Sequence, residues 1–248
     1  MIQKFDISIE KHRDLCPTCG SNYNNFKGPL KEWKNNNCNC YQQNKLWKDY
    51  SLINIPRQFY SKDFSDYEFI DDEENKGYFI NIKKYIENID AVYESGSNLF
   101  LYSGASSTGK TFFATCILKE AYRKNYITYF VPFVHIYNEI SNSRDFGNYL
   151  KKLCSYDFLV IDSIDKIIKT VFLSDLKVLN FLEELLKTRY KPTIFTSQES
   201  INADLETLKI VKRSLKERVF ELHIDHAKAY NKNDYWDRLL ETKKEIIK

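Results

Sequence analysis

At 248 residues the chain is long enough for one α/β domain with a small appendage, and 43% hydrophobic with 29% charged residues is typical of a globular protein. The formal net charge of +3 is too small to indicate nucleic-acid binding by itself. No apolar stretch approaches the roughly 20 residues of a membrane span, and the first residues do not resemble a signal peptide, so we expect a cytoplasmic protein without membrane contact.

Residues 1–50 contain four of the six cysteines, arranged in two close pairs. Cys16 and Cys19 belong to a Cys-Pro-Thr-Cys-Gly knuckle, and Cys38 and Cys40 follow after an eighteen-residue insert. Four thiolates in such pairs are typical of a closed structural zinc site, although the one-residue spacer of the second pair is less usual. We therefore predict a small zinc-binding module, and the alternative is a set of unrelated reduced thiols.

A linker is predicted over 51–77, and an α/β domain over 78–248. The linker should be extended near Pro56, because proline restricts the residue before it. Apolar residues at helical spacing predict a helix over 78–93. Further along, strands are predicted at 99–103, 128–131, 158–161 and 193–196, and helices at 110–124, 134–141 and 173–188. This alternation indicates right-handed crossovers and a central parallel sheet.

A phosphate-binding loop is predicted between the first strand and the next helix. The stretch Gly-Ala-Ser-Ser-Thr-Gly-Lys-Thr fits G-x-x-x-x-G-K-[ST]. In such a loop backbone N–H groups and a helix N-terminus face the phosphates. We predict ATP binding, with Lys110 on the β- and γ-phosphates and Thr111 on Mg²⁺. The loop residues are Gly104, Ala105, Ser106, Ser107, Thr108, Gly109, Lys110 and Thr111.

The second half of an ATPase site is predicted where the strand over 158–161 ends. Asp162 closes this apolar run, and such an acid holds Mg²⁺. In hydrolysing ATPases the next residue is usually an acid that orients the attacking water, whereas here it is Ser163. Since a hydroxyl cannot act as a general base at neutral pH, we expect slow hydrolysis. Asp165 is the nearest acid that could substitute, and the alternative is a solvated loop acid.

The spacing of these motifs resembles the DnaC/DnaI/IstB group of AAA+ proteins, which includes bacterial and phage helicase loaders and transposition helper ATPases. The resemblance covers about residues 52–225. It rests on the phosphate loop, on the strand ending in Asp162, and on the segments Ile55-Pro56-Arg57-Gln58-Phe59, Ser97-Asn98-Leu99-Phe100-Leu101 and Lys110-Thr111-Phe112-Phe113-Ala114.

Two more residues take their predicted roles from this resemblance. The segment 191–198 resembles the sensor 1 strand, so the Gln198 amide would hydrogen-bond the γ-phosphate or the attacking water. The segment 214–221 resembles the one whose arginine reaches a neighbouring subunit's nucleotide, which makes Arg218 the candidate arginine finger. The alternatives are an ordinary loop amide and a surface salt-bridge residue.

A DNA contact is predicted from residues 208–219. Leu208, Val211, Leu215 and Val219 fall on one helical face, and basic residues occupy the others: Lys209, Lys212, Arg213 and Lys216. Such a face could follow a phosphate backbone, and it is equally a solvated helix face.

The resemblance implies an AAA+ P-loop α/β domain that binds ATP and Mg²⁺ and forms a homo-oligomer with ATP and DNA or helicase bound. The implied function is loading of a DnaB-like replicative helicase onto single-stranded DNA, and an amino-terminal zinc module (Zn²⁺) favours this branch of the group. One alternative is a transposition helper that oligomerises on DNA and recruits a transposase. The other is a non-hydrolysing ATP-binding scaffold.

Overall fold

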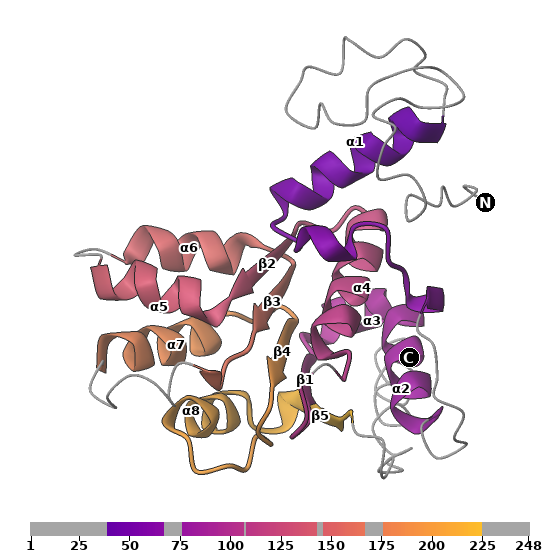
Figure 1. The fold of residues 1–248 in the computed structure, drawn as a ribbon. Coiled ribbons are helices and arrows are strands. Elements are labelled where there is room, and N and C mark those ends of the chain that lie inside the picture. The colour runs from indigo at the N-terminus through magenta and orange to yellow at the C-terminus, as the bar shows by residue number, and fades with distance from the viewer. Residues whose placement is uncertain (1–38, 67–75, 107, 143–145, 167–175, 225–248) are drawn as a thin grey trace, which may run out of the picture. The chain divides into compact units, whose positions relative to one another are not determined.

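The computed structural model describes residues 39–66, 76–106, 108–142, 146–166 and 176–224, and the chain divides into two compact units, Met1–Tyr60 and Ser61–Lys248 (Figure 1). In the first unit, helix α1 (Asn39–Leu52) is followed by the 3₁₀ helix η3 (Arg57–Phe59). Between them Asn54 has a φ of +63°. Helix α1 was not predicted, because the segment shows little apolar periodicity.

The second unit begins with short helices that precede the sheet. They are η4 (Phe64–Asp66), α2 (Lys76–Glu87) and α3 (Ile89–Ser95). The sequence predicted one helix over 78–93, but the chain breaks at Asn88, whose side-chain amide donates to the Lys84 carbonyl (2.9 Å). Asparagine favours such local bonds to the backbone, and they compete with helix formation.

A parallel five-stranded sheet forms the centre of the second unit, in the order β2-β3-β4-β1-β5. The strands are β1 (Asn98–Tyr102), β2 (Thr128–Pro132), β3 (Phe158–Asp162), β4 (Thr193–Ser197) and β5 (Val219–His223). The first four confirm the predicted strands and the parallel sheet. The fifth was not predicted, because this edge strand alternates buried and half-buried residues instead of forming an apolar run.

Helices cover both faces of this sheet (Figure 1). Helix α4 (Lys110–Arg123) packs on one face, on the side where α2 and α3 also lie. The other face carries α5 (Phe133–Asn142), α6 (Gly147–Ser155), α7 (Leu176–Thr188) and α8 (Glu206–Leu215). Buried side chains of these four helices join Phe100, Ile161 and Phe195 of the strands in one core. The unit is therefore a three-layer α/β/α domain.

The end of α8 differs from the prediction of one helical face over 208–219. Leu208, Val211 and Leu215 are buried on α8 as predicted. Val219 is not on that helix, because a 3₁₀ turn, η7 (Lys216–Arg218), ends it and Val219 begins β5. Within the described ranges, no helix is both long and apolar enough to cross a membrane.

Candidate nucleotide-binding site

The candidate site lies at the edge of the sheet where β1, β3 and β4 end, which is where parallel α/β sheets bind ligands. The predicted loop connects β1 to α4 there, and all of it except Ser107 is described. Gly104, Ala105 and Ser106 are exposed, so a phosphate can approach their backbone. Gly109 has a φ of +93°, a left-handed conformation that glycine adopts without strain.

Lys110, the first residue of α4, directs its ammonium group back over the loop. Its Nζ donates to the carbonyls of Ser103 (3.2 Å) and Ala105 (2.8 Å) and to the hydroxyl of Thr108 (3.1 Å). These contacts hold the cation at the loop, where it can neutralise phosphate oxygens.

A chain of short hydrogen bonds joins α4, β3 and β4 beneath the loop. The hydroxyls of Thr111 (2.8 Å) and Thr196 (2.7 Å) both donate to Asp162 Oδ1. The Thr196 oxygen also accepts the backbone N–H of Ser163 (2.8 Å). Thr196 was missed in the sequence, where the only signal is a polar residue at the end of an apolar strand.

The donor set of this chain fits Mg²⁺. Thr111 Oγ1 and Asp162 Oδ1 come from different elements and meet at 2.8 Å, and Mg²⁺ prefers such oxygen ligands while keeping several waters. These two residues would hold the ion, and the ion would neutralise charge on the β- and γ-phosphate oxygens. The residues predicted for Mg²⁺ are therefore brought together.

Ser163 occupies the position of the usual water-orienting acid, and its side chain turns back on the magnesium acid. Its φ is +58°, and its hydroxyl donates to Asp162 Oδ2 (3.3 Å). The hydroxyl thus contacts the acid predicted for Mg²⁺, and slow hydrolysis stays a prediction.

We expect Ser163→Glu to raise steady-state phosphate release by about 100-fold or more, because general-base assistance is typically worth 10²–10⁴. Serine already has a Cβ in the left-handed conformation, so glutamate adds no new backbone strain. Ser163→Gln is the matched control, since it has the same shape and cannot accept the proton. Release measured with saturating ATP and single-stranded DNA should rise in the first variant only. Equal rates in both variants would mean that the catalytic water is oriented elsewhere.

Asp165 is buried rather than solvated. It is 1% exposed, so the interpretation as a solvated loop acid is wrong. Among the described residues neither carboxylate oxygen has a hydrogen-bond partner. A carboxyl closed off from solvent does not reach an attacking water in this conformation, so the geometry does not favour the predicted substitute role.

Gln198 and Arg218 lie at opposite edges of the sheet. Gln198 directly follows β4, beside the end of β3 and at the same edge of the sheet as the phosphate loop, and its sensor role stays a prediction. Arg218 directly precedes β5, whose first residue pairs with Asn98 at the start of β1. The phosphate loop follows the other end of β1, and four strand steps separate the two edges by about 13 Å. Arg218 therefore does not reach the loop of its own chain.

Two of the four basic residues predicted on this face, Lys209 and Arg213, are paired with acids, and Lys212 donates to the Asn202 amide oxygen (2.8 Å). Lys209 lies 2.6 Å from Asp204 and 2.9 Å from Glu206, and Arg213 lies 2.5 Å from Glu183. These pairs offset part of the positive charge of the face, and the DNA contact stays a prediction beside the solvated-face interpretation.

The zinc prediction falls outside the described residues. Cys16, Cys19 and Cys38 are not described, and of Cys40 only the backbone is, as part of α1. Among the side chains that are described, no cluster of three His, Cys, Asp or Glu residues could hold a metal. The four-cysteine site stays a prediction.

Together, a three-layer fold, a phosphate loop and a strand-end acid define the P-loop class of ATP-binding proteins. A family model described as IstB-like ATP binding protein matches residues 42–210. The chain therefore belongs to the IstB-like ATP-binding family, and the predicted membership of the DnaC/DnaI/IstB group is confirmed. No curated protein matches the chain.

Several solved structures share the fold. The DnaC helicase loader is 21% identical with a TM-score of 0.54, covering 68% of this chain and 100% of that one. DnaI is 19% identical with a TM-score of 0.53, covering 71% and 95%. The replication initiator DnaA bound to AMPPCP and single-stranded DNA is 18% identical with a TM-score of 0.52, covering 69% and 52%. At these identities the likeness establishes the fold alone.

Proposed function

We propose that this protein is an AAA+ ATPase that loads a DnaB-like replicative helicase onto single-stranded DNA. The observation that carries the proposal is the placement of Lys110 at the phosphate loop together with the contact between Thr111 and Asp162, an arrangement that fits ATP and Mg²⁺. It is joined to a fold that matches nearly the full length of the solved DnaC and DnaI chains.

The proposed mechanism uses ATP as a switch. The loop N–H groups and Lys110 bind the phosphates, and Thr111 and Asp162 hold Mg²⁺. Gln198 contacts the γ-phosphate and so reports whether ATP or ADP is bound. Since Arg218 does not reach its own site, it contacts the nucleotide of a neighbouring copy, which makes assembly depend on ATP. Slow hydrolysis then prolongs the assembled state.

The amino-terminal cysteines support the loader branch. We propose that Cys16, Cys19, Cys38 and Cys40 bind Zn²⁺ in a module that contacts the helicase. A transposition helper is the second candidate, and the observation that favours it is the family model itself, which is named for IstB. The position of Ser163 favours the third candidate, a scaffold that binds ATP without hydrolysing it.

Affinity capture with the full-length protein tests the function. With ATP and single-stranded DNA present, we expect the wild type to recover a hexameric replicative helicase from cells that naturally contain the protein. Lys110→Ala should recover much less, and Cys16→Ser with Cys38→Ser should lose both zinc, by elemental analysis, and the helicase. Recovery of a transposase with duplex DNA, and of no helicase, would establish the transposition helper instead.

A further inference from the structure

Arg218 lies against an exposed aromatic ring at the amino-terminal edge of the sheet. Its Cζ is 4.9 Å from the centroid of the Tyr190 ring. Tyr190 is 73% exposed, so its side chain is not held there by burial. A guanidinium that lies over an aromatic face keeps the N–H groups at its own edge available for another acceptor.

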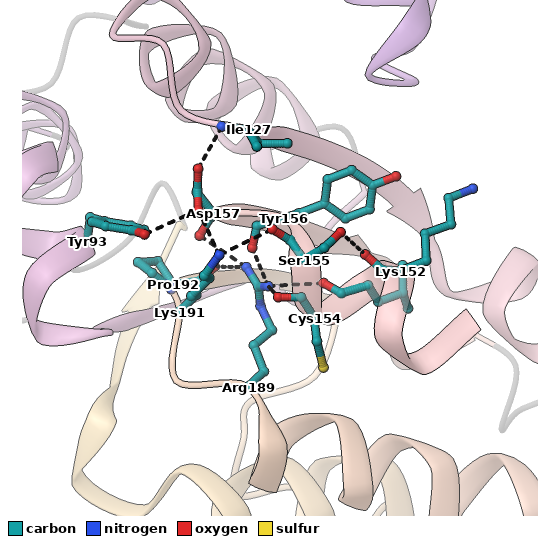
Figure 2. A network of polar contacts seen from close by, with 11 residues as sticks. Tyr93, Ile127, Lys152, Cys154, Ser155, Tyr156, Asp157, Arg189, Lys191 and Pro192 are labelled. Atoms are coloured by element: carbon teal, nitrogen blue, oxygen red, sulfur yellow. Dashed lines mark hydrogen bonds and ion pairs between the residues drawn. The ribbon is translucent and has the colours of Figure 1, made fainter. Parts of the chain in front are cut away.

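The two residues that flank Tyr190 in the sequence, Arg189 and Lys191, are both held by hydrogen bonds (Figure 2). Arg189, which is 3% exposed, points inward and donates to the carbonyls of Tyr156 (2.5 Å) and Pro192 (3.0 Å). Lys191 donates to the carboxylate of Asp157 (2.8 Å). Because both flanking residues are anchored, the backbone position from which the Tyr190 ring projects is defined.

The Tyr190 backbone also lies closely against the turn after α3. A Cβ on Gly96 would lie 2.3 Å from the Tyr190 carbonyl oxygen, and Gly96 has a φ of +61°. Only glycine allows both this approach and this conformation without strain. The turn that carries Tyr190 is thus held from a second side.

One buried side chain connects this turn to the backbone of Arg218. Asn98 donates from Nδ2 to the Arg218 carbonyl (2.9 Å). Its Oδ1 accepts the backbone N–H of Thr193 (2.9 Å), three residues after Tyr190. The backbones that carry the Tyr190 ring and the Arg218 guanidinium are therefore linked through Asn98.

We infer that Tyr190 is a positioning residue for Arg218. The ring holds the guanidinium extended at an edge from which it cannot reach its own phosphate loop, in the orientation needed to meet the nucleotide of a second copy of the chain. Restricting a long side chain before assembly lowers the entropy lost when it binds. This inference rests on the proposed function, in which Arg218 acts on a neighbouring copy.

Assembly of the full chain tests the inference. The protein concentration at half-assembly is measured by sedimentation with ATP, Mg²⁺ and a single-stranded oligonucleotide. Tyr190→Ala should raise it about threefold, which is the size of one exposed cation–π contact. Tyr190→Phe should behave as the wild type, because it keeps the ring.

Arg218→Ala should raise the protein concentration at half-assembly more than Tyr190→Ala does, and adding Tyr190→Ala to Arg218→Ala should have no further effect. ATP affinity of the dilute protein should stay unchanged in the Tyr190 variants, and circular dichroism should show that both remain folded.

Each of the other possible results would contradict either the inference alone or both the inference and the proposed function. Wild-type assembly in Tyr190→Ala, with Arg218→Ala impaired, would overturn the inference and leave the proposed function intact. Normal assembly in Arg218→Ala, or no ATP-dependent assembly of the wild type, would overturn both. If Tyr190→Ala weakened oligonucleotide binding by the dilute protein but not assembly at saturating DNA, the ring would be a base-stacking surface. A Tyr190→Phe variant as impaired as Tyr190→Ala would assign the role to the hydroxyl and overturn the inference.

Discussion

Replacing Lys110 with alanine is expected to lower the affinity for Mg²⁺–ATP by about 100-fold or more. The ammonium group is positioned at the loop by Ser103, Ala105 and Thr108, and a phosphate would present stronger, charged acceptors at the same place. Hydrogen bonds to charged groups are worth about 1.5–3 kcal/mol each, so losing two of them costs at least two factors of ten.

The measurement is an equilibrium titration of the purified variant with Mg²⁺–ATP, accompanied by circular dichroism to show that it is folded. Lys83→Ala is a suitable control, because Lys83 lies on the exposed side of α2 and pairs only weakly with Glu87 at 3.8 Å. It should bind ATP as the wild type does. Unchanged affinity in folded Lys110→Ala would mean that the nucleotide does not bind at this loop.

The sequence predicted those elements of the fold whose pattern lies within one short stretch of residues. Strand β3 is a run of buried apolar residues ending in Asp162, and it was predicted to within one residue. Strand β5 and helix α6 were missed, because an edge strand such as β5 has no continuous apolar run and α6 is a short amphipathic helix. The phosphate loop, by contrast, was predicted from its motif, because all its residues are contiguous in the sequence and its backbone geometry is local.

The relations within the site depend on residues that are far apart in the chain. Thr196 and Asp162 are 34 positions apart, and only the pairing of β3 with β4 brings the hydroxyl to the carboxylate. Likewise, nothing near Tyr190 in the sequence indicates that its ring lies under Arg218, because that contact depends on the pairing of β5 with β1. Predicting contacts of this kind requires the order of the strands in the sheet. The sequence predicted a parallel sheet but not its strand order.

Arg189 is the other residue whose importance appears only in the structure. Its guanidinium donates to six acceptors around the ends of α6 and α7: the carbonyls of Leu153, Cys154, Tyr156, Asp157 and Pro192, and the hydroxyl of Thr193. Figure 2 labels Cys154, Tyr156, Asp157 and Pro192 among these acceptors. Burial lowers the pKa of Arg189 to about 10, so the group remains protonated at neutral pH and all its donors are present.

We expect Arg189→Met to lower the free energy of unfolding by about 3 kcal/mol, because the substitution leaves buried carbonyls without donors at about 1–3 kcal/mol each. The loss falls short of the sum over all six acceptors, since Pro192 also accepts the Leu159 N–H and the partly buried carbonyls can bind water.

Arg213→Met is the matched control: it removes an exposed arginine paired with Glu183 and should cost less than about 1 kcal/mol. Urea titration of both variants without nucleotide gives the comparison, and Arg189→Lys, which keeps the charge but not the planar fork, should fall between them. If Arg189→Met unfolded at the same urea concentration as Arg213→Met, water would be replacing the guanidinium, and the edge that carries Tyr190 would not depend on Arg189 for its rigidity.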